Sequence, residues 1–242
     1  MLKLPKIIGH RGAAAYAPEN TLDGIRTAAD MGLQWVELDV KLSKDGVAII
    51  FHDDELDRTT NGTGKVAETD FATLQDLDCG SWFSDSFIGT EIPTLEQALE
   101  EIINLNMCLN LEIKPCPGRE LETAEVALDI LARYWDEPQK LLLSSFEAVS
   151  LETCKDMAPE WLRGYLLEKE PHENWQEYAD YLDITTLNIN GAELTIERLN
   201  EYRQLNKPLL AYTINDAQMA HHLFHMGISG IFTDAPDLLL SD

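Results

Sequence analysis

Positive charge is scarce in this sequence: its 242 residues include 18 lysines and arginines against 43 aspartates and glutamates, a formal net charge of −25. Nucleic acids and anionic membrane surfaces bind basic stripes and patches, and none is visible along the chain. We therefore expect no nucleic-acid partner and no stable association with a membrane. A small anionic substrate is compatible with this composition if its pocket is locally positive.

Cysteine and long apolar runs are scarce as well. The four cysteines, at positions 79, 108, 116 and 154, form no CxxC pair and no cluster with histidine, which argues against a zinc site. No apolar run approaches the length of a membrane span, and residues 1–5 are too short and interrupted for a signal peptide. We expect a cytoplasmic protein with reduced thiols.

The chain does contain a regular alternation of apolar, strand-like runs and helical patterns. Eight such strands alternating with helices predict a single α/β domain over residues 1–242, a (β/α)8 barrel. An open, doubly wound sheet is the alternative, but the length and the strand count favour closure. The predicted strands are 6–9, 35–40, 108–113, 140–144, 162–167, 183–188, 208–213 and 229–232. The predicted helices are 20–31, 94–103, 121–134, 146–156, 173–181, 195–203 and 216–225.

Residues 47–52 interrupt this alternation because they follow the second predicted strand with no room for a helix. The pair Asp45-Gly46 between the two runs predicts a hairpin. A two-residue turn would set His52 opposite Asp39, and a four-residue loop would set it opposite Glu37. Both registers put His52 on the carboxylate side of the strand, whereas a three-residue loop would not, unless a bulge corrected it.

Residues 53–92 form an insertion after the second barrel strand, rich in Asp, Thr, Gly and aromatic residues. Insertions after a barrel strand lie on its C-terminal face, where the active sites of such barrels are found. We therefore expect these residues to form a small inserted lid, with a decorative loop as the alternative.

Charged residues alternate with apolar ones on two predicted neighbouring strands. Because strand side chains alternate in direction, Glu37 and Asp39 point into the barrel from one strand, and Glu112 and Lys114 from the next. Burying such charges without compensation costs several kcal/mol each. A structural ion-pair cluster is one solution, but a hard divalent cation (Mg²⁺, Ca²⁺ or Mn²⁺) suits three oxygen ligands better. Three carboxylates, one such ion, Arg11 and Lys114 leave a net charge of +1, which a phosphodiester neutralises.

Two histidines complete this predicted site. His10 follows the apolar run Ile7-Ile8, and His52 ends the predicted hairpin strand, so each lies at the C-terminal end of a strand. Two imidazoles on either side of a phosphodiester can act as general base and general acid near neutral pH. The other four histidines lie in helical patterns, and we expect them to face solvent or pack.

With these residues in place, the sequence resembles the glycerophosphodiester phosphodiesterases, over about residues 6 to 236 and most closely the short cytoplasmic bacterial type. The motifs are jointly specific in this order. They are His10-Arg11-Gly12, Pro18-Glu19-Asn20-Thr21, Glu37-Leu38-Asp39, Lys44-Asp45-Gly46, His52-Asp53, Leu56-Asp57-Arg58-Thr59-Thr60, Ile92-Pro93-Thr94-Leu95, Leu111-Glu112-Ile113-Lys114, Leu143-Ser144-Ser145-Phe146 and Thr233-Asp234.

The resemblance implies a TIM barrel that hydrolyses glycerophosphodiesters to sn-glycerol 3-phosphate and an alcohol, the glycerol 2-hydroxyl being the nucleophile. It further implies a division of labour among the site residues. Metal binding falls to Glu37, Asp39 and Glu112, acid/base catalysis to His10 and His52, and phosphate binding to Arg11 and Lys114. Tyr212 stands where the family usually has Trp; it can still wall the glycerol pocket, and its hydroxyl adds a polar handle.

Three other functions compete with this interpretation. A lipid phosphodiesterase similar to phosphatidylinositol-specific phospholipase C would need an exposed apolar or basic rim to reach lipid, which the acidity disfavours. A phosphodiester-binding module without catalysis predicts the loss of a histidine or carboxylate, yet all five are present. A phosphosugar enzyme would want a Gly-rich loop after the seventh strand, where this chain has Ile214-Asn215-Asp216-Ala217.

Overall fold

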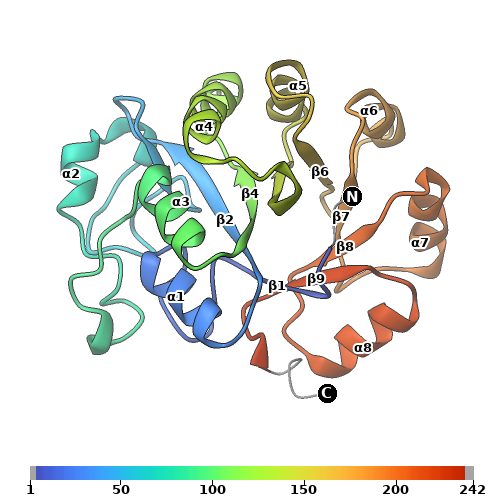
Figure 1. The fold of residues 1–242 in the computed structure, drawn as a ribbon, viewed down its shortest axis with the longest axis horizontal. Coiled ribbons are helices and arrows are strands. Elements are labelled where there is room, and N and C mark those ends of the chain that lie inside the picture. The colour runs from blue at the N-terminus through green and yellow to red at the C-terminus, as the bar shows by residue number, and fades with distance from the viewer. Residues whose placement is uncertain (1–3, 238–242) are drawn as a thin grey trace.

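A computed structural model describes residues 4–237 and shows one closed parallel barrel with helices around it (Figure 1). The barrel is closed because β1 pairs in parallel with both β2 and β9, the first and last neighbours in the ring. The open-sheet alternative is thereby excluded. The strands are β1 (Ile7–Gly9), β2 (Trp35–Leu42), β3 (Ala48–Ile50), β4 (Cys108–Ile113), β5 (Leu141–Ser145), β6 (Leu162–Leu166), β7 (Thr186–Asn190), β8 (Leu209–Tyr212) and β9 (Gly230–Thr233).

The helices lie between these strands as the sequence predicts, with one short addition inside the insertion. They are α1 (Leu22–Asp30), α2 (Phe71–Gln75), α3 (Leu95–Asn104), α4 (Glu120–Tyr134), α5 (Ala148–Met157), α6 (Trp175–Tyr181), α7 (Ile196–Tyr202) and α8 (Ala217–His225). Single 3₁₀ turns cover Val66–Glu68, Asp85–Phe87, Pro138–Lys140 and Arg203–Leu205. Within the described residues, no helix has the length and apolarity needed to cross a membrane.

The largest error in a strand boundary lies at β7, which begins at Thr186 rather than at residue 183. Asp183 has a left-handed backbone with φ of 46°, and Leu182 caps α6, so the chain is still turning at these positions. Ile184 packs into the core from this turn, which explains why an apolar residue there imitates a strand.

The hairpin β2–β3 exists, but both expected registers are wrong. Its ladder pairs Val40 with Ile50 and Leu42 with Ala48, and the backbone N–H of Ser43 donates to the carbonyl of Val47 at 3.0 Å. The loop is therefore the three-residue one, with Gly46 in the left-handed region at φ of 83°. The ladder ends at Ile50, so the direction of His52 is set by the chain that leaves the strand and not by strand alternation.

The inward face of β2 changes character along its length. Trp35 packs in the lower barrel, where inward side chains form one apolar cluster, while Glu37, Asp39 and Lys41 follow above it on the same face. The outward residues Val36, Leu38 and Val40 belong instead to the core between strands and helices. Apolar packing thus closes the barrel at its base, and the charges gather only at the C-terminal end. The lower cluster comprises Ile8, Trp35, Leu142, Leu210 and Phe232.

The insertion, residues 53–92, lies beside the barrel, where it carries α2 (Figure 1). It has its own apolar cluster, shared with β3 through Ile49 and with the β4–α4 segment through Cys116. Only its first two residues, Asp53 and Asp54, line the main cavity. The inserted segment is therefore a packed unit whose contact with the cavity is made by its N-terminal end. The cluster comprises Ile49, Phe51, Leu56, Val66, Leu74, Cys79, Ile92 and Cys116.

Candidate active site

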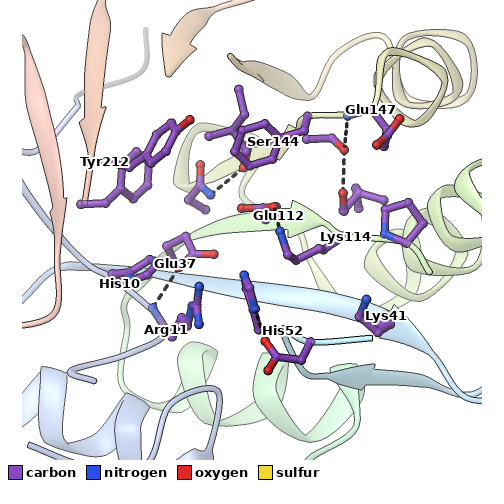
Figure 2. Close-up of a pocket in the computed structure, with 18 of the residues that line it drawn as sticks. His10, Arg11, Glu37, Lys41, His52, Glu112, Lys114, Ser144, Glu147 and Tyr212 are labelled. Atoms are coloured by element: carbon purple, nitrogen blue, oxygen red, sulfur yellow. Dashed lines mark hydrogen bonds and ion pairs between the residues drawn. The ribbon is translucent and has the colours of Figure 1, made fainter. Parts of the chain in front are cut away.

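A cavity of about 700 Å³ opens at the C-terminal ends of the barrel strands (Figure 2). In the view of Figure 2, His10 and Tyr212 lie toward one end and Lys41 and Glu147 toward the other. Asp39 is the one predicted site residue that does not line the cavity, and its carboxylate is buried beside those that do. The predicted residues on the cavity wall are His10, Arg11, Glu37, His52, Glu112, Lys114 and Tyr212.

Three buried carboxylates form the centre of this site. One oxygen from each of Glu37, Asp39 and Glu112 lies within 4.8 Å of the others. Burial, reinforced by the negative charges of its neighbours, raises the pKa of Glu37 well above its usual range and that of Glu112 to about 7. Burial also acts to raise the pKa of Asp39, but Arg11, His52 and Lys114 outweigh it and lower that pKa. The raised pKa values of Glu37 and Glu112 show that the neighbouring cations do not fully compensate the negative charge of the three carboxylates.

A divalent cation fits this cluster. Glu37 Oε1 is buried and accepts no hydrogen bond, so one oxygen of the cluster has no partner among the described residues. The three ligand atoms are all carboxylate oxygens, which hard cations prefer, and they come from adjacent strands that fix their spacing.

A strained turn after β1 holds these carboxylates in place. Arg11 has a φ of 50° and Gly12 a φ of 90°, which aims the backbone N–H of Arg11 at Glu37 Oε2, 2.9 Å away. Gly12 is required because a Cβ there would lie 2.6 Å from the backbone of Gly24. Asn20, also left-handed, donates to Asp39 Oδ2 at 2.8 Å and accepts the N–H of Asp39 at 3.1 Å.

Two cations border the carboxylates. Arg11 Nη1 donates to Glu19 at 2.7 Å, while Arg11 Nε is buried without a hydrogen bond and lies 3.5 Å from Asp39. Lys114 Nζ donates to Glu112 at 3.0 Å and lies 5.3 Å from the centre of the Phe146 ring. Burial acts to lower the pKa of each cation, yet the neighbouring carboxylates outweigh it and keep both pKa values raised. Both groups are therefore charged and next to the cavity.

Each predicted histidine is paired with an aspartate through the same ring nitrogen. His10 Nδ1 lies 2.6 Å from Asp234 Oδ1, and His52 Nδ1 lies 2.6 Å from Asp53 Oδ1. A carboxylate accepts only, so each Nδ1 carries the proton and each Nε2 is left to act in the cavity. Burial, together with the nearby positive charges, lowers the pKa of His52, which keeps that ring neutral at pH 7. Two imidazoles with fixed tautomers thus border one cavity.

Tyr212 lines the cavity, and its ring packs edge-on against Phe146 with centroids 5.7 Å apart. Its hydroxyl donates to the backbone carbonyl of Leu167 at 2.5 Å. The Tyr212 hydroxyl, expected to offer a polar contact in the glycerol pocket, therefore donates its hydrogen bond to the protein backbone instead.

Sequence reasoning gave no role to several residues that the structure brings to this site. Asp53 directly follows His52, which is a usable signal for a pair. Asp234 is 224 residues from His10 in the chain, and only the parallel pairing of β1 with β9 brings them together. Asn215 donates to Asp234 Oδ2 at 2.6 Å, and nothing in its sequence context marks this role.

Comparison with known proteins agrees with this geometry. The sequence profile described as "Glycerophosphoryl diester phosphodiesterase family" matches residues 10–238. The protein YhdW of Bacillus subtilis (strain 168) is 34% identical over 243 residues, covering 98% of this chain and 97% of its own. A glycerophosphodiester phosphodiesterase of Caldanaerobacter subterraneus subsp. tengcongensis is 31% identical, covering 97% and 96%. A phosphodiesterase from Oleispira antarctica, solved with its product sn-glycerol-3-phosphate, superposes with a TM-score of 0.93 at 40% identity, covering 98% and 96%.

Proposed function

The chain belongs to the glycerophosphoryl diester phosphodiesterase family, and from this premise we propose that it hydrolyses glycerophosphodiesters to sn-glycerol 3-phosphate and an alcohol. The observation that carries the proposal is the juxtaposition, in one cavity, of three buried carboxylates, two cations and two aspartate-paired histidines. The carboxylates would hold a divalent cation, and the cations and histidines would act on a phosphodiester.

In this proposal Glu37, Asp39 and Glu112 hold Mg²⁺, Ca²⁺ or Mn²⁺. When bound, such an ion supplies positive charge to the phosphate oxygens. The guanidinium of Arg11 and the ammonium of Lys114 bind the same phosphate and stabilise the negative charge that builds up on it during displacement.

The two histidines move the protons. One imidazole accepts the proton of the glycerol 2-hydroxyl at Nε2 as that oxygen bonds to phosphorus. The other, in its doubly protonated imidazolium form, donates its Nε2 proton to the oxygen of the leaving alcohol as the bond from phosphorus to that oxygen breaks. Attack from within the substrate has a high effective molarity, up to about 10⁵ M or more. Water then opens the cyclic glycerol phosphate, and the two histidines exchange roles.

The glycerol end would lie against the aromatic wall. Tyr212 and Phe146 offer an apolar surface for carbon, and the Tyr212 hydroxyl is held by Leu167. We propose that residues 53–92 act as a lid subdomain beside this mouth, and that the enzyme works in the cytoplasm, which the four free cysteines support.

A substrate panel tests the reaction. We expect glycerol 3-phosphate to be released from glycerophosphodiesters, no release after exhaustive chelation, and restoration by Mg²⁺, Ca²⁺ or Mn²⁺. Phosphatidylinositol in vesicles represents the lipid phosphodiesterase alternative and should stay intact. Full activity after chelation contradicts the metal proposal, and no release from any glycerophosphodiester contradicts the function itself.

The route is tested with two further substrates. A 2-deoxyglycerol analogue should bind but turn over barely, because it lacks the internal nucleophile, and the cyclic glycerol phosphate should itself be hydrolysed. Comparable turnover of the 2-deoxy analogue would rule out the cyclic route and favour direct attack by water.

Metal binding can be measured without turnover. Glu112→Gln keeps the side-chain volume but removes one negative charge, so calorimetric titration should show much weaker divalent binding than in the wild type. Glu122→Gln, on the exposed side of α4 and paired with Arg119, is the matched control and should bind the ion as the wild type does. Equal affinity in both variants would remove Glu112 from the ligand set.

A further inference from the structure

Arg58, which lies outside the cavity, donates hydrogen bonds to two carboxylates. Arg58 Nε and Nη2 donate to the two oxygens of Asp53 at 2.6 and 2.9 Å. Its Nη1 and Nη2 donate to the two oxygens of Glu19 at 2.8 and 2.7 Å. Arg58 therefore forms a bidentate pair with each of two carboxylates, the geometry in which a guanidinium binds most strongly and most directionally.

Each of the two carboxylates contacts a different residue of the proposed site. Asp53 accepts the Nδ1 proton of His52 at 2.6 Å, and Glu19 accepts a hydrogen bond from Arg11 Nη1 at 2.7 Å. A continuous chain of contacts thus runs from His52 through Asp53, Arg58 and Glu19 to Arg11. One end of this chain is a proposed proton-transfer group and the other a proposed phosphate ligand.

Arg58 itself touches neither the cavity nor the three-carboxylate cluster. It is absent from the cavity wall, and its side chain is 46% exposed at the surface of the insertion. Its hydrogen bonds are the first cause of a lowered pKa at Asp53, so that carboxylate stays ionised and accepts from His52. Any effect of Arg58 on the reaction must therefore pass through Asp53 and Glu19.

The other histidine has no such support. Asp234, the partner of His10, is held by Asn215, whose side-chain amide donates to Asp234 Oδ2 and whose Oδ1 accepts the backbone N–H of Asp234. The His10 pair is therefore fixed within the barrel, and only the His52 pair depends on a residue of the insertion. This difference gives an internal control within the same active site.

We propose that Arg58 is a positioning residue of the hydrolysis reaction: by clamping Asp53 to Glu19 it fixes His52 and Arg11 relative to each other at the cavity wall. The proposal rests on the function proposed above and assigns the insertion a specific task. Without Arg58, the side chains of His52 and Arg11, which must act on one phosphodiester together, are no longer held in place. Misplacement of such groups lowers kcat more than it weakens substrate binding.

Kinetics of Arg58→Gln test the clamp. Carboxylates that orient a functional histidine are worth about 10- to 100-fold in activity, and we expect a fall in kcat of this size with a much smaller change in KM. Arg58→Lys should not restore kcat, because an ammonium cannot bind two carboxylates in bidentate fashion. In the double variant with Asp53→Asn, the two losses should not multiply, because Arg58 acts through Asp53.

Arg26 provides a matched control. It makes a bidentate pair with Glu101 between α1 and α3, at 2.9 Å for both bonds, and its side chain is 50% exposed. Arg26→Gln therefore removes a surface pair of the same kind away from the cavity, and we expect wild-type kcat. If Arg58→Gln also keeps wild-type kcat, or loses activity only in proportion to the unfolded fraction measured by circular dichroism, the proposal is overturned.

A measurement without substrate separates this proposal from the assigned reaction. Nitrogen NMR of the histidine rings should show the Nδ1–H tautomer for His10 and His52 in the wild type, because each Nδ1 faces an aspartate. In Arg58→Gln we expect His52 to lose this single tautomer while His10 keeps it. An unchanged His52 signal overturns the clamp even if the enzyme acts on glycerophosphodiesters. A lost signal supports it even if the substrate proves to be different.

Discussion

The two histidine–aspartate pairs have the same local geometry and different supports. In each pair Nδ1 lies 2.6 Å from an aspartate oxygen. The aspartate of the His10 pair is held by the neutral amide of Asn215, close to the barrel backbone, whereas that of the His52 pair is held by the charged Arg58 from the insertion. The same distance in the two pairs is therefore achieved by two different supports, each of which fixes an imidazole at the edge of the proposed phosphate site.

The difference follows from where each histidine lies in the chain. His10 directly follows β1, and Asp234 directly follows β9, the neighbouring barrel strand whose register on β1 is fixed. His52 lies beyond the end of β3, outside any ladder, so no strand partner can fix it. Arg58, a residue of the insertion, takes over the role of a strand partner by binding the two carboxylates of Asp53 and Glu19.

The largest expected loss of kcat follows from removal of either imidazole. Positioned acid/base groups are worth roughly 10²–10⁴ in rate, so His10→Ala and His52→Ala should each lower kcat by about that factor with the fold retained. The control is His221→Ala on α8, which should change kcat very little. If both site variants kept wild-type kcat, neither histidine would be an acid or base of this reaction.

A smaller effect is expected when only the orienting carboxylates change. Asp234→Asn and Asp53→Asn should each reduce kcat by about 10- to 100-fold, because the imidazole loses the acceptor that fixes its tautomer. The two variants should differ in one further respect. Asp53→Asn also weakens the hydrogen bonds between residue 53 and Arg58, so the Glu19 carboxylate and the Arg11 side chain bound to it should become more mobile. Phosphate protection of Arg11 from chemical modification would report this, and equal protection in both variants would contradict the asymmetry.

The smallest expected effect concerns stability and pH. Arg58 lowers the pKa of Asp53, so its contribution is fully present above the unfolded pKa of about 4 and declines as pH falls below it. Arg58→Gln should therefore destabilise by about 1–2 kcal/mol at pH 7, a modest value because the side chain is half exposed. The difference in unfolding free energy between the variant and the wild type should narrow progressively as pH falls below about 4.

The same denaturation measurements on Asn215→Ala test the other histidine–aspartate pair. Asn215 donates to the Asp234 carboxylate, which titrates, but it also accepts from the hydroxyl of Thr233 and from the backbone N–H of Asp234, and these two donors do not titrate. Its destabilisation should therefore persist at pH 3 to a larger extent than that of Arg58→Gln. Parallel curves for the two variants would mean that the charge on Asp53 contributes nothing to the Arg58 clamp.

Much of the candidate active site could be predicted because strand alternation is a local rule. Once 35–40 and 108–113 are taken as neighbouring strands, the inward direction of Glu37, Asp39 and Glu112 follows, and the register of β2 on β4 sets Asp39 beside Glu112. The hairpin register failed because the number of residues in a tight loop depends on the turn itself. Ser43 bonds to both Asp45 and Val47 there, and this selects the three-residue loop.

The closed α/β barrel, the inward carboxylates and the position of His10 after the first strand could be predicted from the sequence, since these depend on periodicity and on motifs within a few residues. What holds those groups in place depends instead on contacts between segments that are far apart in the sequence. Asp234 meets His10 because the barrel closes, and Arg58 meets Glu19 because the insertion folds back beside the β1–α1 turn. Residues that meet only when the barrel closes or the insertion folds back are far apart in the sequence, so no local pattern predicts their contact. These contacts nevertheless fix the tautomer on which the proposed chemistry depends.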